Sequence, residues 1–375
     1  MLGTLAIVAA GLWAYAAQQP RVTVTVDEVI PPEEAAVIMR LVRAATASLD
    51  ERAKDDRLYK RDAHAKPHGC VTAVLDVNAD LDPRFRHGVF AEPSGRYQAW
   101  VRFSNGTQSD DSQRDAHGMA IKLMNVQGPK LLSPQDDPEQ GTQDFVMVNY
   151  HTFFLRTVAE YEEFFGYQLR NRPIAYFFAG WPLSWKLHPF YHGARMLFRR
   201  VASPLATSYY SMSAYRLGPH NVKFSAQPCV MPDALMPRPL TPNYLREALV
   251  RDLQGKDACF RFLVQLQDPT RNMPIEDPTI QWDERDSPYV PIATLTIPAQ
   301  EFNTDVQNRF CERLSFTPWH ALAEHRPVGA LNRVRQAVYR EVSRRRHARN
   351  ATLRGEPRGW CLDLSGQPCP AEGPS

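Results

Sequence analysis

The sequence predicts an α+β fold in which a mostly antiparallel β-sheet closes into a barrel, with helices inserted between strands and flanking them. Several short segments alternate apolar and polar residues, as half-buried strands do. The connections between these segments are far longer than hairpin turns, which leaves room for inserted helices. The 31 prolines argue against an all-helical chain, because proline interrupts helix hydrogen bonding.

Composition sets further limits on the protein. The chain has 375 residues, 43% of them hydrophobic, which suffices for one large domain or two smaller ones. Its 44 basic and 41 acidic residues give a net charge of +3 and no general case for nucleic acid as a partner. The six cysteines contain no Cys-x-x-Cys pair, so a zinc site is not favoured. Cys361 and Cys369 could close a small disulfide loop in an exported protein, or be free thiols.

The N-terminal segment is the first predicted element. Leu2 to Ala17 carries no charge, and the first charged side chain is Arg21. Sixteen residues fall slightly short of the roughly 20 that span a bilayer, but they suit the core of a signal peptide. We therefore expect residues 1–17 to be a signal peptide or membrane anchor that places the protein on the periplasmic side. A buried N-terminal helix is the alternative.

Residues 18–60 are predicted to form an N-terminal arm and helix. Val22, Val24 and Val26 alternate as in a short strand. Pro31-Pro32-Glu33-Glu34 then suits a helix start, because proline fits the first turn and acidic residues favour the helix dipole. Apolar residues recur at helical spacing as far as Ala45.

Residues 61–300 contain the predicted barrel and a helical insert. Alternating or densely apolar segments predict strands at 70–77, 97–103, 119–124, 145–149, 221–226, 260–266 and 292–297. Between them, 159–169 reads as an aromatic helix, and 176–198 as an aromatic segment broken by Pro182 and Pro189. This insert could be a lid that faces a membrane or a substrate, or ordinary core.

The C-terminal part is predicted to be helical and then loose. After a short amphipathic helix at 244–253, residues 301–354 form a helical segment in which Asn332 to Arg346 is the clearest helix. Its basic end suits a helix C-terminus. The Pro- and Gly-rich residues 355–375 are expected to be a flexible tail.

Arginines within apolar segments point to an anionic partner. Arg61 precedes His64 by three residues, and Arg102 lies inside an apolar strand. A buried charge without a partner is costly, so a bound anion is expected there.

These residues carry a family resemblance. Arg61-x-x-His64-Ala65-Lys66, Val101-Arg102-Phe103-Ser104 and Arg114-Asp115-x-x-Gly118-x-Ala120-x-Lys122 resemble, in order, the distal motifs of the haem catalase superfamily. The segment from Tyr209 to Gly218 resembles its proximal motif, in which the ligand Tyr lies seven residues before an Arg. The similarity covers roughly residues 55–300 and implies a barrel of the catalase type that binds haem b.

The resemblance implies a role for each matching residue. Tyr209 would ligate the iron as a phenolate. His64 would be the acid–base group, with Ser104 setting its tautomer and Asn149 as a second catalytic group. The remaining members would bind the cofactor: the propionates would be held by Arg61, Arg102 and Arg216, and the ring covered by Phe153 or Phe154.

Some positions depart from the family pattern. The family usually has an Arg four residues before the ligand Tyr, where this chain has Leu205. Gly106 and Ala63 replace apolar residues that narrow the distal pocket. The chain also lacks most of the long N-terminal arm and any C-terminal flavodoxin-like domain. It therefore resembles the small catalase-related branch, with a more open pocket.

The resulting functional hypothesis is a haem-dependent peroxidase or catalase-like enzyme that acts on hydrogen peroxide or organic hydroperoxides. The alternatives are a fatty-acid hydroperoxide isomerase or dehydratase of the allene oxide synthase kind, and a haem-binding protein without catalysis. The expected partners are a peroxide substrate, a lipid or membrane surface and further copies of the chain, with no nucleic acid.

Overall fold

The computed structural model describes residues 2–56, 59–133, 141–352 and 355–369. Its centre is one antiparallel sheet in the order β5-β4-β3-β2-β1-β9-β8-β7-β6. Tyr209 and Tyr210 of β5 also pair with Ala226 and Ser225 of β7, which closes eight strands into a barrel and leaves β6 beside it. The strands are β1 (Pro67–Val77), β2 (Arg96–Asn105), β3 (His117–Leu123), β4 (Gln143–Val148), β5 (Tyr209–Tyr210), β6 (Tyr215–Leu217), β7 (His220–Pro228), β8 (Ala258–Leu266) and β9 (Val290–Ile297). The predicted antiparallel barrel is confirmed, and all seven predicted barrel strands are present.

The barrel interior is the main hydrophobic core. Because side chains alternate along a strand, Val71, Ala73, Leu75 and Val77 of β1 all point inward and are buried. Aromatic rings fill the centre, with Phe145 lying 4.8 Å from Phe262 between ring centroids. The intervening residues of β2 to β4 face outward, toward a layer of helices.

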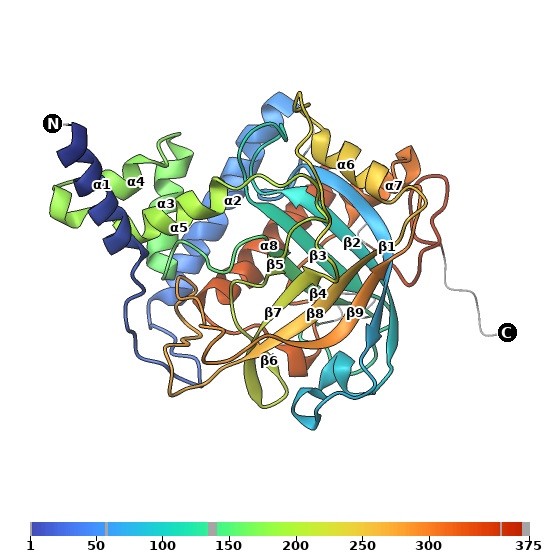
Figure 1. The fold of residues 1–375 in the computed structure, drawn as a ribbon. Coiled ribbons are helices and arrows are strands. Elements are labelled where there is room, and N and C mark those ends of the chain that lie inside the picture. Colours follow the sequence, from blue (N-terminus) through green and yellow to red (C-terminus); the bar gives the residue numbers. More distant parts are fainter. Residues whose placement is uncertain (1, 57–58, 134–140, 353–354, 370–375) are drawn as a thin grey trace.

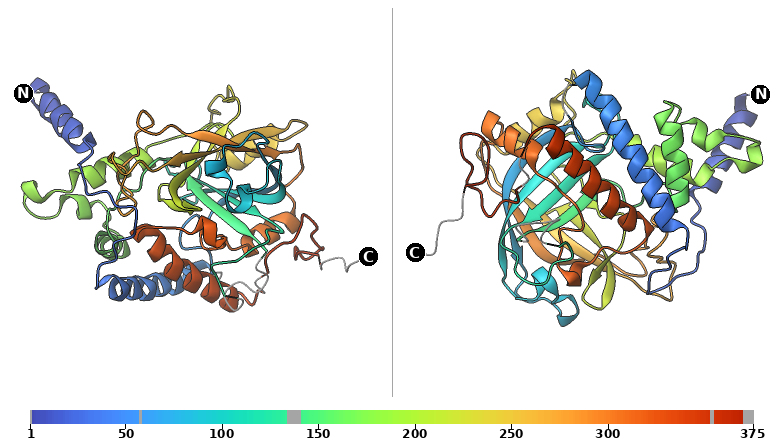
Figure 2. Two further views of the ribbon diagram at one scale, coloured as in Figure 1. Left: turned by 90° about the horizontal axis from the view of Figure 1, so that it is seen from below. Right: turned by 180° about the vertical axis from the view of Figure 1, so that it is seen from behind.

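Three helices form that outer layer, as Figure 2 shows: α2 (Glu34–Asp56), α3 (Val158–Leu169) and α8 (Ala330–Arg349). Their apolar stripes pack together, with Val37 and Leu41 of α2 in one cluster with Val334 and Val338 of α8. The burial of these stripes holds α8 in place across the barrel. Two shorter helices, α6 (Tyr244–Asp252) and α7 (Asp305–Arg313), lie against β1.

A separate group of helices projects to one side of the barrel in Figure 1: α1 (Leu2–Ala17), α4 (Ala175–Phe178), the 3-10 helix η3 (Pro182–Ser184) and α5 (Leu187–Leu197). We call α1 and residues 170–200, which contain the other helices of this group, the helical lobe. The aromatic insert supplies part of its core, since Tyr176 and Phe177 are buried. Among the described residues, no helix is both long and apolar enough to cross a bilayer.

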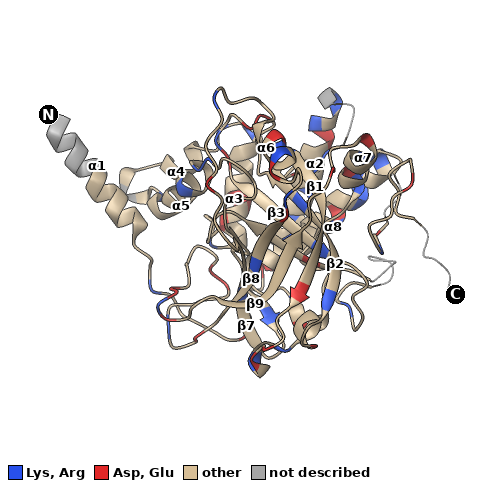
Figure 3. Cartoon of the chain, turned by 45° about the vertical axis from the view of Figure 1, so that its right-hand side comes forward, with Lys and Arg blue, Asp and Glu red and all other residues tan. Residues whose placement is uncertain are grey.

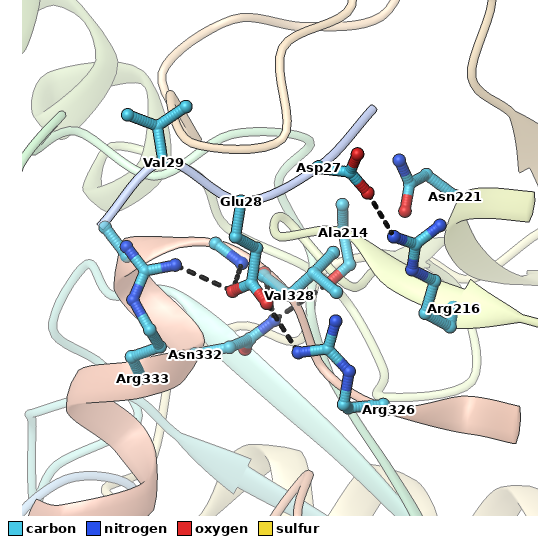
Figure 4. Close-up of polar contacts among 12 residues, drawn as sticks. Asp27, Glu28, Val29, Ala214, Arg216, Asn221, Arg326, Val328, Asn332 and Arg333 are labelled. Carbon is cyan, nitrogen blue, oxygen red and sulfur yellow. Dashed lines mark hydrogen bonds and ion pairs between the residues drawn. The ribbon is translucent and has the colours of Figure 1, made fainter. Parts of the chain in front are cut away.

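The segment before α2 crosses the barrel end as an extended strap. The predicted strand at Arg21–Val26 is wrong: its described backbone bonds reach side chains such as Asn221, which donates to Val26 O at 2.8 Å, and no neighbouring strand pairs with it. At the start of α8, Glu28 accepts from Gly329 N at 2.9 Å and from Arg333 at 2.7 Å (Figure 4). Arg333 also binds Glu34 and Glu276, so one guanidinium joins the strap, α2 and a barrel loop to α8.

Glu28→Gln is expected to destabilise the fold at neutral pH by about 2 kcal/mol, because buried hydrogen bonds to a charged group are lost. Burial alone would raise the pKa of Glu28, but bonds from Arg326, Gly329 and Arg333 outweigh it and hold the pKa below the usual 4.5. This stabilisation is therefore present above the unfolded pKa and is lost as pH falls through the folded pKa. Urea unfolding at neutral and acidic pH measures both effects.

The exposed pair of Arg40 and Glu162 offers a matched control. Glu162→Gln should change stability by less than about 1 kcal/mol, because solvent screens this pair. Equal losses of unfolding free energy in the two variants would contradict a stabilising role of Glu28 in the strap. A loss in Glu28→Gln that stayed the same at acidic pH would contradict it as well.

All six cysteines form disulfides. Cys70 is joined to Cys311, Cys229 to Cys259 and Cys361 to Cys369. The small loop expected at Cys361 and Cys369 is present, and the free-thiol alternative is not. The bond from β1 to α7 ties the barrel to the segment that leads into α8.

Candidate active site

A cavity of about 920 Å³, part of it open to solvent, lies between the outer face of the barrel and α8. Strands β2 to β4 form one wall, α8 forms the opposite wall, and the loop from Arg61 to His64 lies at one side. Its walls are largely apolar, and the residues that carry the chemistry are Arg61, His64, Arg102, Ser104, Tyr339 and Arg346.

The barrel wall holds His64 in a fixed pose. Its backbone has a φ of 56°, an uncommon conformation for a residue other than glycine, and its amide donates to Gly106 O at 2.7 Å. The ring Nδ1 lies 3.1 Å from Ser104 Oγ. Ser104 is paired with Gly118 on β3, and a Cβ at Gly118 would come within 2.6 Å of the imidazole. The absence of a side chain at Gly118 therefore leaves the space that the His64 imidazole occupies.

The environment keeps His64 neutral. Burial lowers its pKa to about 3, and the positive charges of Arg102 and Arg335 contribute. At neutral pH the imidazole can therefore accept a proton from a group in the cavity. Arg102 also fixes the backbone, because its Nη2 donates to His64 O at 2.8 Å.

Three arginines give the cavity an excess of positive charge. Arg61 and Arg346 share Glu312, at 3.0 and 3.4 Å, while Arg102 has no acidic partner in the described part of the chain. The Nε of Arg102 is buried without a hydrogen bond. Burial and the neighbouring Arg61 lower the pKa of Arg346 to about 9 and that of Arg102 well below its usual range. These guanidiniums fit a bound dianion, which would offset their mutual repulsion.

Helix α8 faces this charge with a stripe of functional side chains. Arg335, Tyr339 and Arg346 are four and seven residues apart, which places them on one helix face. Burial opposes the charge of Arg335, but the phenols of Tyr339, Tyr215 and Tyr161 outweigh it and raise the pKa of Arg335. A Tyr phenolate is a hard oxygen ligand suited to ferric iron.

The residues present fit an iron porphyrin with two carboxylates. Tyr339 could supply the axial phenolate from one wall, and His64 faces the cavity from the other. Apolar side chains of Val146, Val338 and Val342 could cover the ring. The cavity has more arginine than carboxylate side chains, which suits the negative charge of two propionates. The Nε of Arg102 is a buried donor without an acceptor, and a propionate oxygen could supply one.

The structure does not bring Tyr209 to this cavity. Tyr209 lies inside the barrel, where its hydroxyl donates to Pro204 O at 2.7 Å and its ring packs 5.9 Å from Phe103. Burial raises its pKa, and no cation offsets this shift. Arg216 is equally remote: on β6 it binds Asp27 of the strap, as Figure 4 shows. Tyr209 and Arg216 therefore do not line the cavity, whereas Tyr339 and Arg346 of α8 do.

Other predicted residues also lie apart from the cavity. Asn149 is buried behind β3, where its Oδ1 accepts from His117 N at 2.8 Å. Phe153 and Phe154 belong to the aromatic cluster of the lobe, and Phe153 reaches the cavity only through Tyr161, with ring centroids 6.0 Å apart. Gly106 lies against Asp115 instead of the cavity, whereas Ala63 does line it.

A signal for the missed residues was present in the sequence. The pattern expected of the proximal segment, a Tyr seven residues before one Arg and four residues after another, occurs in full at Arg335, Tyr339 and Arg346. This segment lies beyond residue 300, outside the range of roughly 55–300 that the resemblance covers.

Comparison with known proteins places this architecture. No family model and no curated protein sequence matches the chain. Solved structures do match: catalase A from Saccharomyces cerevisiae with a TM-score of 0.59 and 18% identity, over 88% of this chain and 68% of that one. The chain has the catalase fold. A fungal catalase gives a TM-score of 0.59 and 17% identity over 89% and 69% of the two chains, and a bacterial catalase gives 0.57 and 17% over 89% and 64%.

Gly118→Ala tests the geometry of the barrel wall. The added methyl would force the His64 ring away from Ser104, and a displacement of about 1 Å can cost on the order of 100-fold in rate. Under the peroxidase function proposed below, peroxide turnover should fall by this factor while haem content is unchanged. Gly166→Ala in α3 is the control, since its nearest side-chain neighbour would be 3.8 Å away. Wild-type turnover in Gly118→Ala would refute the contact.

Proposed function

We propose that the chain is a haem-dependent peroxidase of the catalase type that reduces hydrogen peroxide and organic hydroperoxides in this cavity. The observation that carries the proposal is that Tyr339 and Arg346 of α8 line one cavity together with His64, with Arg335 one turn before Tyr339 on the same helix. The catalase fold supports it, because the solved structures that match this architecture are named as catalases.

Each residue has a defined task in this proposal. Tyr339 holds the haem iron from α8, and Arg61, Arg102 and Arg346 bind the two propionates. When bound, ferric haem supplies the Lewis acid and electrons with which the peroxide O–O bond is cleaved. Neutral His64 accepts the proton of the incoming peroxide and returns it to the leaving oxygen. Ser104 keeps the imidazole in the orientation that this transfer requires.

The lining of the barrel wall supports organic hydroperoxides as substrates. Ala63, Ala120 and Val146 contribute small or aliphatic groups, and Asn149 is not among the lining residues. Apart from His64 and Ser104, this wall therefore offers little polarity to orient hydrogen peroxide. The same lining makes isomerisation of a fatty-acid hydroperoxide the second candidate reaction.

Haem loading and peroxide turnover test the proposal. Purified protein should take up haem b stoichiometrically with a phenolate-type spectrum, and should consume cumene hydroperoxide in the presence of a one-electron dye. Release of oxygen from hydrogen peroxide measures the catalase reaction, and product analysis with a lipid hydroperoxide measures isomerisation. Failure to bind haem would refute the proposal, and binding without turnover would leave a haem-binding protein.

We further propose that the protein is exported. Three disulfides among the described residues support an oxidising compartment, because cytosolic proteins rarely keep such bonds. The uncharged segment at the N-terminus supports the same conclusion. Fractionation of expressing cells would locate the full chain, and recovery from the cytoplasm alone would refute export.

A further inference from the structure

The helical lobe has a surface that the proposed function does not use. Helix α1 lies antiparallel to α5, with the Trp13 ring 4.9 Å from Tyr191 and Ala16 O 3.1 Å from His188 Nδ1. The lobe projects away from the barrel, with the N-terminus at its outer end (Figure 1). It lies apart from the cavity between α8 and the barrel wall.

Exposed aromatic side chains are confined to this lobe. In the described part of the chain, every Trp, Tyr and Phe with an exposed side chain belongs to it. They are Trp13, Tyr15, Trp181, Trp185 and Phe198, and Trp181 is 74% exposed. Elsewhere the rings are buried or partly buried, so this concentration is a local property and not a general looseness of packing.

The charge of the lobe is one-sided. Residues 164–200 contain six Arg or Lys and no Asp or Glu, although the whole chain is nearly balanced at 44 to 41. Arg170, Arg172 and Arg195 are exposed and have no acidic partner among the described residues. Figure 3 shows these helices largely uncharged, with blue positions on α5.

We propose that the helical lobe docks on an anionic lipid bilayer. Trp and Tyr favour the boundary between lipid headgroups and acyl chains, and Arg and Lys are attracted to anionic headgroups. Helices that bury an apolar face and surround it with basic residues lie in the plane of this boundary. The cavity would remain beside the membrane, where lipid-derived hydroperoxides arise. The docking surface itself does not depend on the proposed catalytic function.

Sedimentation with vesicles tests the proposal on the full chain. Binding should be strong to phosphatidylcholine mixed with phosphatidylglycerol, weak to phosphatidylcholine alone, and reduced by salt. Arg170→Gln combined with Arg172→Gln should lower the partition coefficient by about 30-fold, from the loss of two charges near the surface. Ile174→Ser combined with Phe198→Ser should lower it by at least about tenfold, because two exposed apolar side chains no longer enter the lipid.

The loop outside the lobe supplies the matched control. Val230 and Leu235 are 84% and 85% exposed, so Val230→Ser combined with Leu235→Ser should leave vesicle binding unchanged. Equal losses of vesicle binding in the Ile174 and Phe198 variant and in the Val230 and Leu235 variant would overturn the proposal. Equal binding of the wild-type chain to neutral and anionic vesicles would overturn it as well. The chain could instead associate with itself and fail to bind vesicles. If the Ile174 and Phe198 variant abolished this self-association, the surface would be a contact between copies, and the lipid proposal would be overturned.

Discussion

Tyr339→Phe is expected to abolish the phenolate absorption of the haem-loaded protein and to lower its haem affinity by at least about 100-fold. Changes in groups that merely support a metal ligand already cost about 10–100-fold, and this substitution removes the ligand itself. The ring is kept, so the packing of α8 against the barrel changes little. Haem titration followed by absorption spectroscopy measures both effects, and circular dichroism verifies the fold.

Tyr209→Phe is the matched control for this experiment. It removes one buried hydroxyl whose partner is Pro204 O, at a position inside the barrel. We expect a modest loss of stability, about 1 kcal/mol, with haem affinity and spectrum unchanged. If Tyr209→Phe lost haem and Tyr339→Phe kept it, the assignment of the proximal residue to α8 would be wrong.

His64→Gln is expected to lower the rate of peroxide turnover by about 10²–10⁴-fold, the usual contribution of a positioned acid–base group. Haem binding should persist, because Tyr339 and the arginines are untouched. Stopped-flow measurement of the reaction with cumene hydroperoxide reports the step directly. His220→Gln, on β7 and absent from the cavity lining, serves as the control and should keep the wild-type rate.

The same residue predicts the pH dependence of the reaction. The pKa of His64 is lowered to about 3, mainly by burial, so its neutral and proton-accepting form is populated above that pH. The rate of the wild-type reaction should therefore be flat through the neutral range and fall only as pH approaches this value. A midpoint near 6.5, the ordinary pKa of histidine, would contradict the buried environment of the ring.

Much of the barrel and of the wall that carries His64 could be predicted from the sequence, because the information there is local. Alternation along a strand settles which residues face inward, and it placed Arg102 and Ser104 on the outer face together. The short strands β5 and β6 escaped prediction because two or three residues carry no periodicity. The strand predicted at residues 21–26 is absent because side chains far away in the sequence, such as Asn221, form hydrogen bonds with its backbone.

The proximal side separates what a local sequence pattern specifies from what long-range packing specifies. The resemblance implies that a Tyr seven residues before an Arg faces the distal His64, and three pairs have this spacing: Tyr209 with Arg216, Tyr244 with Arg251, and Tyr339 with Arg346. The preceding Arg335 favours the last pair, and the structure decides it, because of these pairs only Tyr339 and Arg346 line the cavity. Seven residues are two helical turns, so both side chains share one face of α8, whereas Tyr244 and Arg251 belong to α6, which lies against β1. The first pair spans two short strands with a turn between them. The choice depends on α2 and α3 packing α8 across the barrel, and such long-range burial cannot be read from a local pattern.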